Sequence, residues 1–321
     1  MDVTGGLSWG ELIESLVATH GTLSAVAWKM IDRAEGDDVA SIERALRRLR
    51  TRGQRDGGRW GQHLIRTFGV PQPIEQRLRW LGLYHSPFSD LPVELCLDQL
   101  RLWDRPPVST SRARVWLHLG FASCGLRRRD HDDATTHARR ARSSLAALGP
   151  DYDTARIELH FIEAYLASRR DGAEADHDAA LTEAARLLGT ATLPDDDRAC
   201  FLARLADHRG YRLNRARDYA AALAEYESIG PTSHPFASYR RDAGRAYALH
   251  KLGRGDEALT SARAAIDHAG DGGYTRLRAM GLLMVAKLRG TEGDGERARA
   301  LAIADRLGDT ELRLRATTTT R

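Results

Sequence analysis

Arginine is concentrated in one short segment near the N-terminus, residues 44–66. This segment holds eight arginines and a single acidic residue, Asp56. The guanidinium group is planar and always charged, and it binds a phosphate or the edge of a guanine with two hydrogen bonds. The residue type and its density therefore predict nucleic-acid binding for this segment, provided that the chain presents these side chains on one exposed face.

The first half of the segment has a helical period that creates such a face. Ile42, Ala45, Leu46 and Leu49 follow spacings of three and four, which predicts a helix with this stripe buried. With about 100° of rotation per residue, four polar residues fall on the opposite face. These candidate DNA-binding residues are Arg44, Arg47, Arg48 and Thr51. Because arginine is frequent throughout the chain, and acidic residues lie between positions 35 and 43, the alternative is a solvated helix in a protein-interaction domain.

The neighbouring segments complete a small domain over residues 1–70. Two shorter helices are expected at residues 9–17 and 22–31, before the arginine-rich helix. After it, Asp56-Gly57-Gly58 separates two short segments, a sequence typical of a hairpin turn. Three helices followed by a hairpin resemble a winged helix-turn-helix domain. The resemblance implies that Arg55 and Arg59 lie in the wing and also contact DNA.

Residues 108–314 repeat a pattern of two helices. A small residue opens the second helix of each unit, at intervals of 36 to 46 residues: Ala134, Ala180, Ala222, Ala258 and Ala298. In the fourth unit the turn glycine Gly253 precedes Ala258 by five residues. This region resembles the tetratricopeptide repeat (TPR). The resemblance implies a right-handed α-solenoid of about five TPR-like helix pairs, whereas a generic array of helical hairpins is the alternative.

In TPR-like arrays the first helix of each pair lines a concave face that binds peptides or partner helices. Alignment of the units predicts a groove of aromatic residues with basic residues nearby. The candidate groove residues are Phe121, Tyr165, Arg169, Tyr211, Arg215, Tyr247 and Lys251. The basic members would hold a carboxylate or an acidic peptide. If the register is off by two residues, the rings are instead buried between helices.

Two segments lie outside these domains. Residues 71–107 predict a helical connector, whose aromatic residues Trp80, Tyr84, Phe88 and Trp103 are expected to pack between the N-terminal domain and the first repeat. Residues 315–321 have no apolar period, so we expect a disordered tail.

Composition and motifs exclude several classes of protein. Of the 321 residues 42% are hydrophobic and 29% are charged, with a mean hydropathy of −0.45, which is typical of a soluble protein. Membrane spans and a secretory signal are not expected, and three isolated cysteines fit a cytoplasmic location. The sequence has no phosphate loop, HExxH or GxSxG motif, and the cluster at residues 129–133 with His137 has the composition of a solvated acidic turn. We therefore predict no catalytic residue, no metal site and no cofactor.

Taken together, these patterns predict an all-α, cytoplasmic, DNA-binding transcriptional regulator. Its expected partner at the N-terminal domain is double-stranded DNA, and the solenoid is expected to bind a peptide or protein signal or to mediate self-association. A homodimer is the expected assembly, and no membrane partner is expected. A TPR adaptor that binds proteins but not DNA is the alternative. Binding of RNA by the solenoid ranks third, because no base-reading pattern recurs in each repeat. The net charge of +4 does not decide between them.

Overall fold

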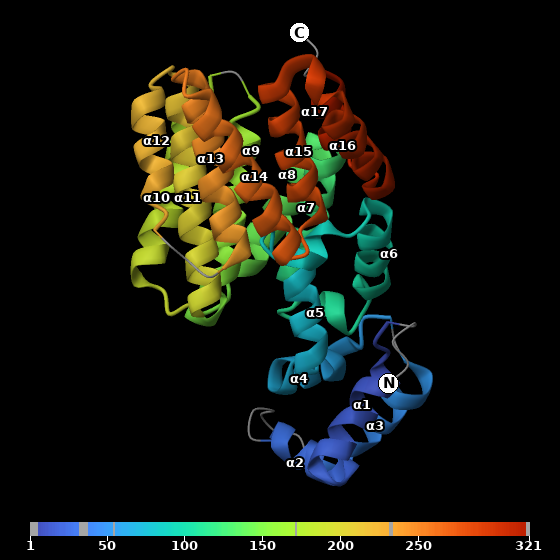
Figure 1. Cartoon of the computed structure of the whole chain (residues 1–321). Helices are drawn as coiled ribbons and strands as arrows, with labels where there is room; N and C mark the ends of the chain where they lie inside the picture. The colour runs from blue at the N-terminus through green and yellow to red at the C-terminus, as the bar shows by residue number, and fades with distance from the viewer. Residues whose placement is uncertain (1–5, 32–37, 54, 171, 231–233, 319–321) are drawn as a thin grey trace.

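The computed structural model describes residues 6–31, 38–53, 55–170, 172–230 and 234–318. Within these ranges every regular element is a helix and there is no β-strand, which confirms the predicted all-α fold. Figure 1 shows a small group of N-terminal helices at one end of the molecule and a larger layered array at the other. None of the helices in these ranges has the length and apolar content needed to cross a bilayer.

The N-terminal group consists of short helices around a common apolar core. They are α1 (Trp9–His20), α2 (Leu23–Ile31), α3 (Val39–Arg52) and α4 (Gly58–Phe68). Ser8 and Glu11 form a reciprocal capping box that fixes the start of α1. Asp38 accepts a hydrogen bond from the backbone of Ser41 and so caps α3. The expected helices at 9–17, 22–31 and 39–52 are therefore present.

The expected hairpin after α3 is wrong, because the chain forms the helix α4 there. Gly57 has the left-handed conformation (φ 75°) and begins the turn into this helix, and Asp56 accepts the backbone N–H of Gly58. Leu64 and Ile65 are buried. A Cβ atom at Gly61 would lie 2.8 Å from the Trp9 ring, so the missing side chain allows α4 to approach α1 closely. The part of the chain described here therefore contains no β-wing.

The connector forms two helices that pack on the first repeat. They are α5 (Gln72–Gly82) and α6 (Val93–Trp103), with a 3-10 turn at Pro87–Asp90 between them. Both helices contact α7, the first helix of the solenoid. One continuous apolar core extends from Leu7 through the connector to Leu205. The N-terminal helices are therefore joined to the solenoid through a packed connector.

The solenoid consists of successive antiparallel helix pairs, and the two helices of each pair contact one another. The pairs are α7 (Arg114–Arg128) with α8 (His131–Leu145), α9 (Asp153–Ala167) with α10 (Glu174–Thr190), α11 (Asp195–Arg215) with α12 (Tyr219–Glu227), α13 (Pro235–Lys251) with α14 (Gly255–Asp271), and α15 (Thr275–Arg289) with α16 (Asp294–Leu307). Further 3-10 turns lie at Val108–Thr110, Pro150–Tyr152 and Gly290–Gly293. These pairs match the expected helical hairpins.

Small residues permit close packing within the pairs, with one exception to the predicted pattern. Ala134, Ala222 and Ala258 are fully buried, as their alignment predicts. Ala298, in contrast, is exposed. In that unit Gly293 makes the close approach, because a Cβ there would lie 2.5 Å from the carbonyl oxygen of Ala286. The predicted register is therefore wrong in the fifth unit.

An additional helix, α17 (Thr310–Thr318), follows the last pair. It contacts both α15 and α7, so the end of the array returns to its beginning. Residues 315–318 are helical, which corrects the expectation of a disordered tail for that part, while residues 319–321 lie outside the described ranges. The first helices of the pairs, α7, α9, α11, α13 and α15, each contribute a residue that contacts the loop between α5 and α6, and we call the surface that they form the inner surface of the solenoid.

Candidate nucleic-acid interface and inner surface

Helix α3 presents the arginines that the sequence placed on one face. The predicted stripe of Ile42, Ala45, Leu46 and Leu49 is buried. On the opposite side Arg44, Arg47, Arg48 and Thr51 are exposed. The local period therefore positions these four side chains together on the outside of the N-terminal helices.

These exposed side chains differ in how strongly their own helix holds them. Arg47 forms an ion pair with Glu43 at 2.5 Å, and Arg44 donates to the Ser41 hydroxyl at 3.2 Å. Arg48 pairs with none of the residues that the structure describes. An exposed ion pair within one helix contributes at most about 1 kcal/mol, so a phosphate can displace Glu43 at little cost.

The arginines assigned to the wing lie instead at the start of α4. Arg55 is exposed in the turn before this helix, and Arg59 is exposed in its first turn. The guanidinium of Arg59 lies 5.0 Å from the centre of the Trp60 ring. A role of these two side chains in a β-wing is excluded by the helix, whereas their positive charge remains on the surface. Of the acidic residues noted before α3, Glu35 and Asp37 lie outside the described residues.

The predicted groove residues occupy the C-terminal ends of the inner helices. Tyr165 and Arg169 lie at the end of α9, and the guanidinium of Arg169 stacks 4.7 Å from the Tyr165 ring centre. Tyr211, near the end of α11, is 52% exposed. Arg215 is exposed on the same helix.

The predicted groove residues of the fourth and first units, Tyr247 and Phe121, lie in different surroundings. Tyr247 of α13 lies beneath Lys251 and beneath Lys287 of α15. Phe121 of α7, in contrast, is only 7% exposed and stacks on His137 of α8 at 4.7 Å. The groove assignment of Phe121 is therefore wrong, because in this unit the ring packs between the two helices of the pair. We call the surface formed by Tyr165, Arg169, Tyr211, Tyr247, Lys251 and Lys287 the open half of the inner surface.

The other half of the inner surface is filled by the loop between α5 and α6, which the sequence did not place there. Tyr84, in this loop, accepts hydrogen bonds from Arg240 of α13 at 2.8 Å and from Arg276 of α15 at 2.9 Å. Burial alone would raise the pKa of Tyr84, but the guanidinium groups of Arg240 and Arg276 outweigh burial, and the pKa lies below its ordinary value. We call this region, residues 83–91 with the inner-helix residues that bind them, the connector half.

Buried charges hold the connector loop against each inner helix. Glu158 of α9, 1% exposed, forms two hydrogen bonds with Arg204 of α11 at 2.5 and 3.0 Å. The guanidinium of Arg204 also lies 5.0 Å from the Tyr84 ring centre. His85 contacts Asp197 of α11 at 2.9 Å. These contacts join residues that are 46 to 112 positions apart in the chain.

Asp309, immediately before α17, joins the two ends of the solenoid. Its side chain is fully buried and accepts hydrogen bonds from Arg127 of α7 at 3.1 Å and from Arg276 of α15 at 2.7 Å. Arg127 also donates to the carbonyl oxygens of Ser89 and Leu91 in the connector loop. Burial raises the pKa of Asp309, but Arg276 and Arg127 have the larger combined effect, so the pKa lies below its ordinary value.

The aromatic residues of the connector do not form the single junction that the sequence predicted. Trp103 is buried, as expected. Trp80 and Phe88 are 43% and 45% exposed and stack on one another at 5.1 Å. Tyr84 points to the inner surface, as described above. The local signal that could have indicated the position of Tyr84 is the polar pair Tyr84-His85 in a short loop between two helices. The arginine partners of Tyr84, however, lie far away in the sequence.

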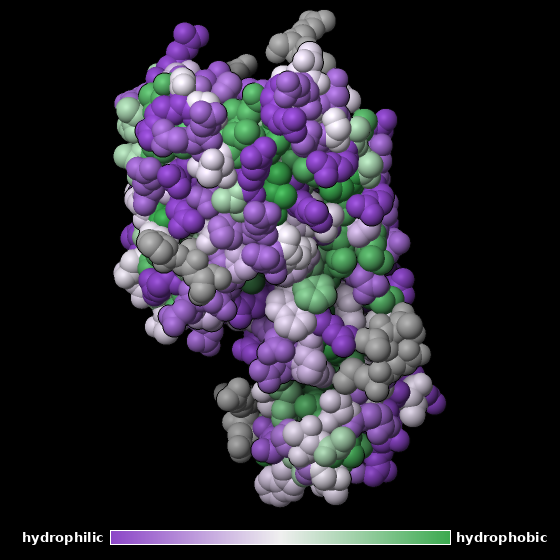
Figure 2. Space-filling view, in the orientation of Figure 1, coloured by the Kyte–Doolittle hydropathy of each residue, from purple (hydrophilic) through white to green (hydrophobic). Residues whose placement is uncertain are grey.

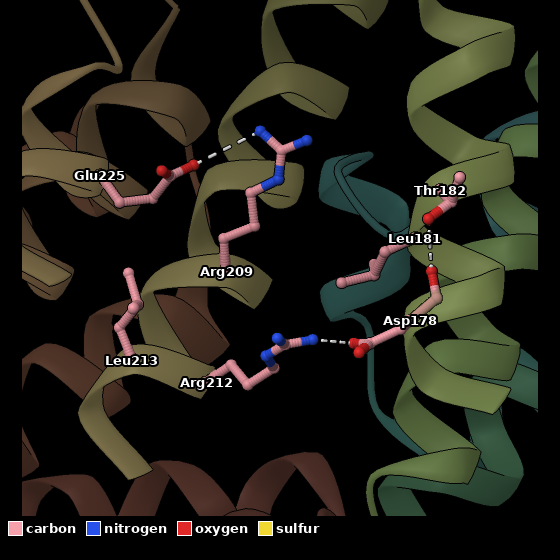
Figure 3. A pocket seen from close by; sticks show the side chains of 7 residues that line it. All are labelled: Asp178, Leu181, Thr182, Arg209, Arg212, Leu213 and Glu225. Carbon is pink, nitrogen blue, oxygen red and sulfur yellow. Dashed lines mark hydrogen bonds and ion pairs between the residues drawn. The ribbon is translucent and has the colours of Figure 1, made fainter. Parts of the chain in front are cut away.

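A surface pocket of about 420 Å³ lies between α10, α11 and α12. Figure 3 shows that its charged side chains are paired across it: Arg212 with Asp178, and Arg209 with Glu225 at 3.7 Å. Figure 2 shows that hydrophilic residues cover most of the neighbouring solenoid surface. Within the described ranges no cluster of three or more histidine, cysteine or acidic residues is placed to hold a metal ion. The pocket therefore offers no unpaired charge for catalysis.

No family model and no curated protein matches the sequence. Among solved structures, the chain is similar to Bacillus thuringiensis PlcR, in a crystal structure with the peptide PapR7 and DNA. The TM-score is 0.52 at 10% sequence identity, and the alignment covers 97% of this chain and 99% of PlcR. The likeness is one of fold. It extends over both the N-terminal helices and the solenoid.

Proposed function

We propose that this protein is a DNA-binding transcriptional regulator whose N-terminal helices bind double-stranded DNA and whose solenoid binds a peptide or protein signal. The observation that carries the proposal is the exposed arginine face of α3, in a chain whose fold matches that of PlcR along nearly its whole length. PlcR was solved with both a peptide and DNA, so this arrangement of helices is compatible with both partners.

The DNA contacts follow from the placement of α3. Arg44, Arg47 and Arg48 share one exposed face, from which they can reach base edges in the major groove. Arg55 and Arg59, at the start of α4, add positive charge for the phosphate backbone. Two copies of the chain would bind paired half-sites, because a single small domain of this kind gives limited affinity and specificity.

The signal would bind at the open half of the inner surface. The exposed ring of Tyr211, the half-buried rings of Tyr165 and Tyr247, and basic side chains are present there, whereas the connector loop already occupies the other half. Tyrosine and arginine are the residue types that contribute most to protein-protein and protein-peptide contacts. No catalytic step is proposed, and the cell compartment expected for such a regulator is the cytoplasm.

The proposal is tested by replacing Arg44, Arg47 and Arg48 together with alanine. Because each lost base contact costs roughly 1–3 kcal/mol, affinity for duplex DNA should fall by at least about 100-fold. The matched control replaces Arg139, Arg263 and Arg306, which are exposed on the outer helices α8, α14 and α16, and so removes the same charge. The control should retain nearly all of the affinity, and both variants should keep their helicity. Equal binding by both variants would refute the assignment of α3, and no DNA binding by the wild type would favour the adaptor function.

A further inference from the structure

Lysine is rare in this chain, yet two of its lysines lie together. The sequence has only Lys29, Lys251 and Lys287 among its 48 basic residues. Lys251 comes one turn after Tyr247 on α13, and Lys287 is on the neighbouring inner helix α15. Their ammonium groups lie 5.8 and 5.0 Å from the centre of the same Tyr247 ring. Two inner helices thus bring both cations to one aromatic side chain.

The positive charge of this cluster is not neutralised by the surrounding residues that the structure describes. Neither lysine forms an ion pair with them, although Arg245 and Arg254 nearby pair with Glu227 and Glu257. Burial lowers the pKa of Lys287, and the charge of Lys251 lowers it further. Burial, followed by Lys287 and Lys251, also lowers the pKa of His250. A bound anion would relieve this repulsion.

The two ends of the open half differ in this respect. At the α9 end, Arg169 forms an ion pair at 3.0 Å with Glu311 of α17, a carboxylate that also pairs with Arg129 and Arg315. At the α13–α15 end, the positive charges of Lys251 and Lys287 have no such partner within the described residues. The exposed ring of Tyr211 lies on α11, between these helices in the order of the inner surface. An extended ligand on this surface would therefore contact the Tyr211 ring and, at the α13–α15 end, the two positive charges of Lys251 and Lys287.

We propose that Lys251 and Lys287 bind a carboxylate group of the peptide ligand, with Tyr247 supporting both ammonium groups. The proposal rests on the proposed function in one respect, namely that a peptide occupies the inner surface. A carboxylate fits because it accepts charge-assisted hydrogen bonds from two ammonium donors at once. It comes either from an acidic side chain or from a free C-terminus, and the two sources differ in which synthetic peptide binds.

The scarcity of lysine makes a direct measurement feasible. Reductive methylation with ¹³C-formaldehyde labels Lys29, Lys251, Lys287 and the α-amino group, and dimethyl-lysine keeps its positive charge. The probes are three acetylated pentapeptides that share the uncharged sequence Ala-Phe-Ala-Phe, whose rings suit the tyrosine surface, and that end in aspartate amide, in phenylalanine with a free carboxylate, or in asparagine amide. The NMR signals are assigned with the variants Lys251→Arg and Lys287→Arg, and Lys29 on α2 is the internal control.

We expect the Lys251 and Lys287 signals to shift with a carboxylate peptide but not with the asparagine amide, while the Lys29 signal stays unchanged. The variant Lys251→Gln/Lys287→Gln should bind the better carboxylate peptide about 10-fold more weakly or worse, as expected for loss of charged hydrogen bonds. The variant Lys29→Gln should bind it like the wild type.

Three outcomes would overturn the proposal. In the first, the NMR signals of all three lysines shift equally. In the second, the asparagine amide shifts the Lys251 and Lys287 signals as much as the carboxylate peptides do. In the third, these two signals do not move at the highest concentration at which each peptide dissolves. Inorganic phosphate is run in parallel, and shifts with phosphate but with neither carboxylate peptide also overturn it. Because DNA binding by α3 is measured separately, failure of this subsite is distinguishable from failure of the proposed regulator function.

Discussion

The two halves of the solenoid's inner surface differ in whether their charged side chains are buried and paired. In the connector half, Glu158, Arg204 and Asp309 are buried, and each is paired with an opposite charge. In the open half, Lys251 and Lys287 are exposed and have no acidic partner among the described residues. A buried charge without a partner is very costly, so the first set must serve the fold. The second set contributes little to the fold, which leaves it available for a ligand.

Figure 1 shows α1–α4 beyond one end of the solenoid and the C-terminus at the opposite end. Tyr84 and Asp90 of the loop between α5 and α6 contact Arg276, which also binds Asp309. The connector half therefore links the N-terminal helices physically to the closing contact of the solenoid.

The largest expected effect is that of Asp309→Asn. This change leaves Arg127 and Arg276 without their shared carboxylate in a buried site, which should lower the free energy of unfolding by about 3–5 kcal/mol. Urea denaturation followed by circular dichroism measures the loss. The control Asp305→Asn removes an exposed carboxylate on α16 and should change stability by less than about 0.5 kcal/mol. Equal stability of the two variants would contradict the role of Asp309.

A smaller effect is expected for Tyr84→Phe, which removes one hydroxyl oxygen from the connector half. Arg240 and Arg276 lose an acceptor but keep carboxylate partners, so the free energy of unfolding should fall by about 2 kcal/mol. Tyr211→Phe, in the open half, should leave it unchanged, because Tyr211 is exposed. If both changes have the same effect on the denaturation midpoint, the distinction between the halves is wrong.

The solenoid should also lose stability in acid through His208 of α11, which stacks on Phe161 of α9 at 5.5 Å. Burial, and then Arg204, lower the pKa of His208 from 6.5 to about 3. Between these values the unfolded chain binds a proton that the folded chain does not, so stability falls as the pH decreases from 6.5 toward 3. The slope from this residue is up to about 1.4 kcal/mol per pH unit. The variant His208→Gln should show a slope lower by this amount, and an unchanged slope would contradict the assignment.

The smallest effect on stability is expected in the open half. The double variant Lys251→Gln/Lys287→Gln removes two mutually repelling charges that have no ion pair within the described residues, so the free energy of unfolding should change by no more than about 0.5 kcal/mol. Thermal unfolding at neutral pH measures it. A loss comparable to that of Asp309→Asn would mean that these lysines maintain the fold.

Local sequence patterns predicted the elements whose packing depends on their own periodicity. The stripe at Ile42, Ala45, Leu46 and Leu49 gave α3 with the correct buried face. The same reasoning applied to Gly61, Leu64, Ile65 and Phe68 would have predicted α4, but Asp-Gly-Gly was interpreted as a hairpin turn. In the structure these residues begin a helix instead.

The end of the chain contained a second local signal that was missed. Gly308 ends α16 in the left-handed conformation, and Asp309 caps α17 by accepting the backbone N–H of Leu312. A glycine followed by a capping aspartate is a regular signal for one helix ending and another beginning. The run of threonines after Ala316 concealed it, because threonine has a low helix propensity.

The connector half could not have been predicted from local spacing. The hydroxyl of Tyr84 meets Arg240 and Arg276, which lie 156 and 192 residues further along the chain. Such pairs depend on how the whole solenoid curves. Phe121 shows the same limit, since its repeat position alone did not reveal that His137 would cover it.

The most direct test of the account is binding of the purified protein to labelled duplex DNA from around its own gene, at about 50 and 200 mM salt. A protein that neutralises several phosphates loses orders of magnitude in affinity over this range. We predict tight, sequence-preferring binding at the lower salt concentration and a steep loss at the higher one. If no binding is measured at 50 mM salt, the arginine face of α3 is a solvated surface and the regulator function is wrong.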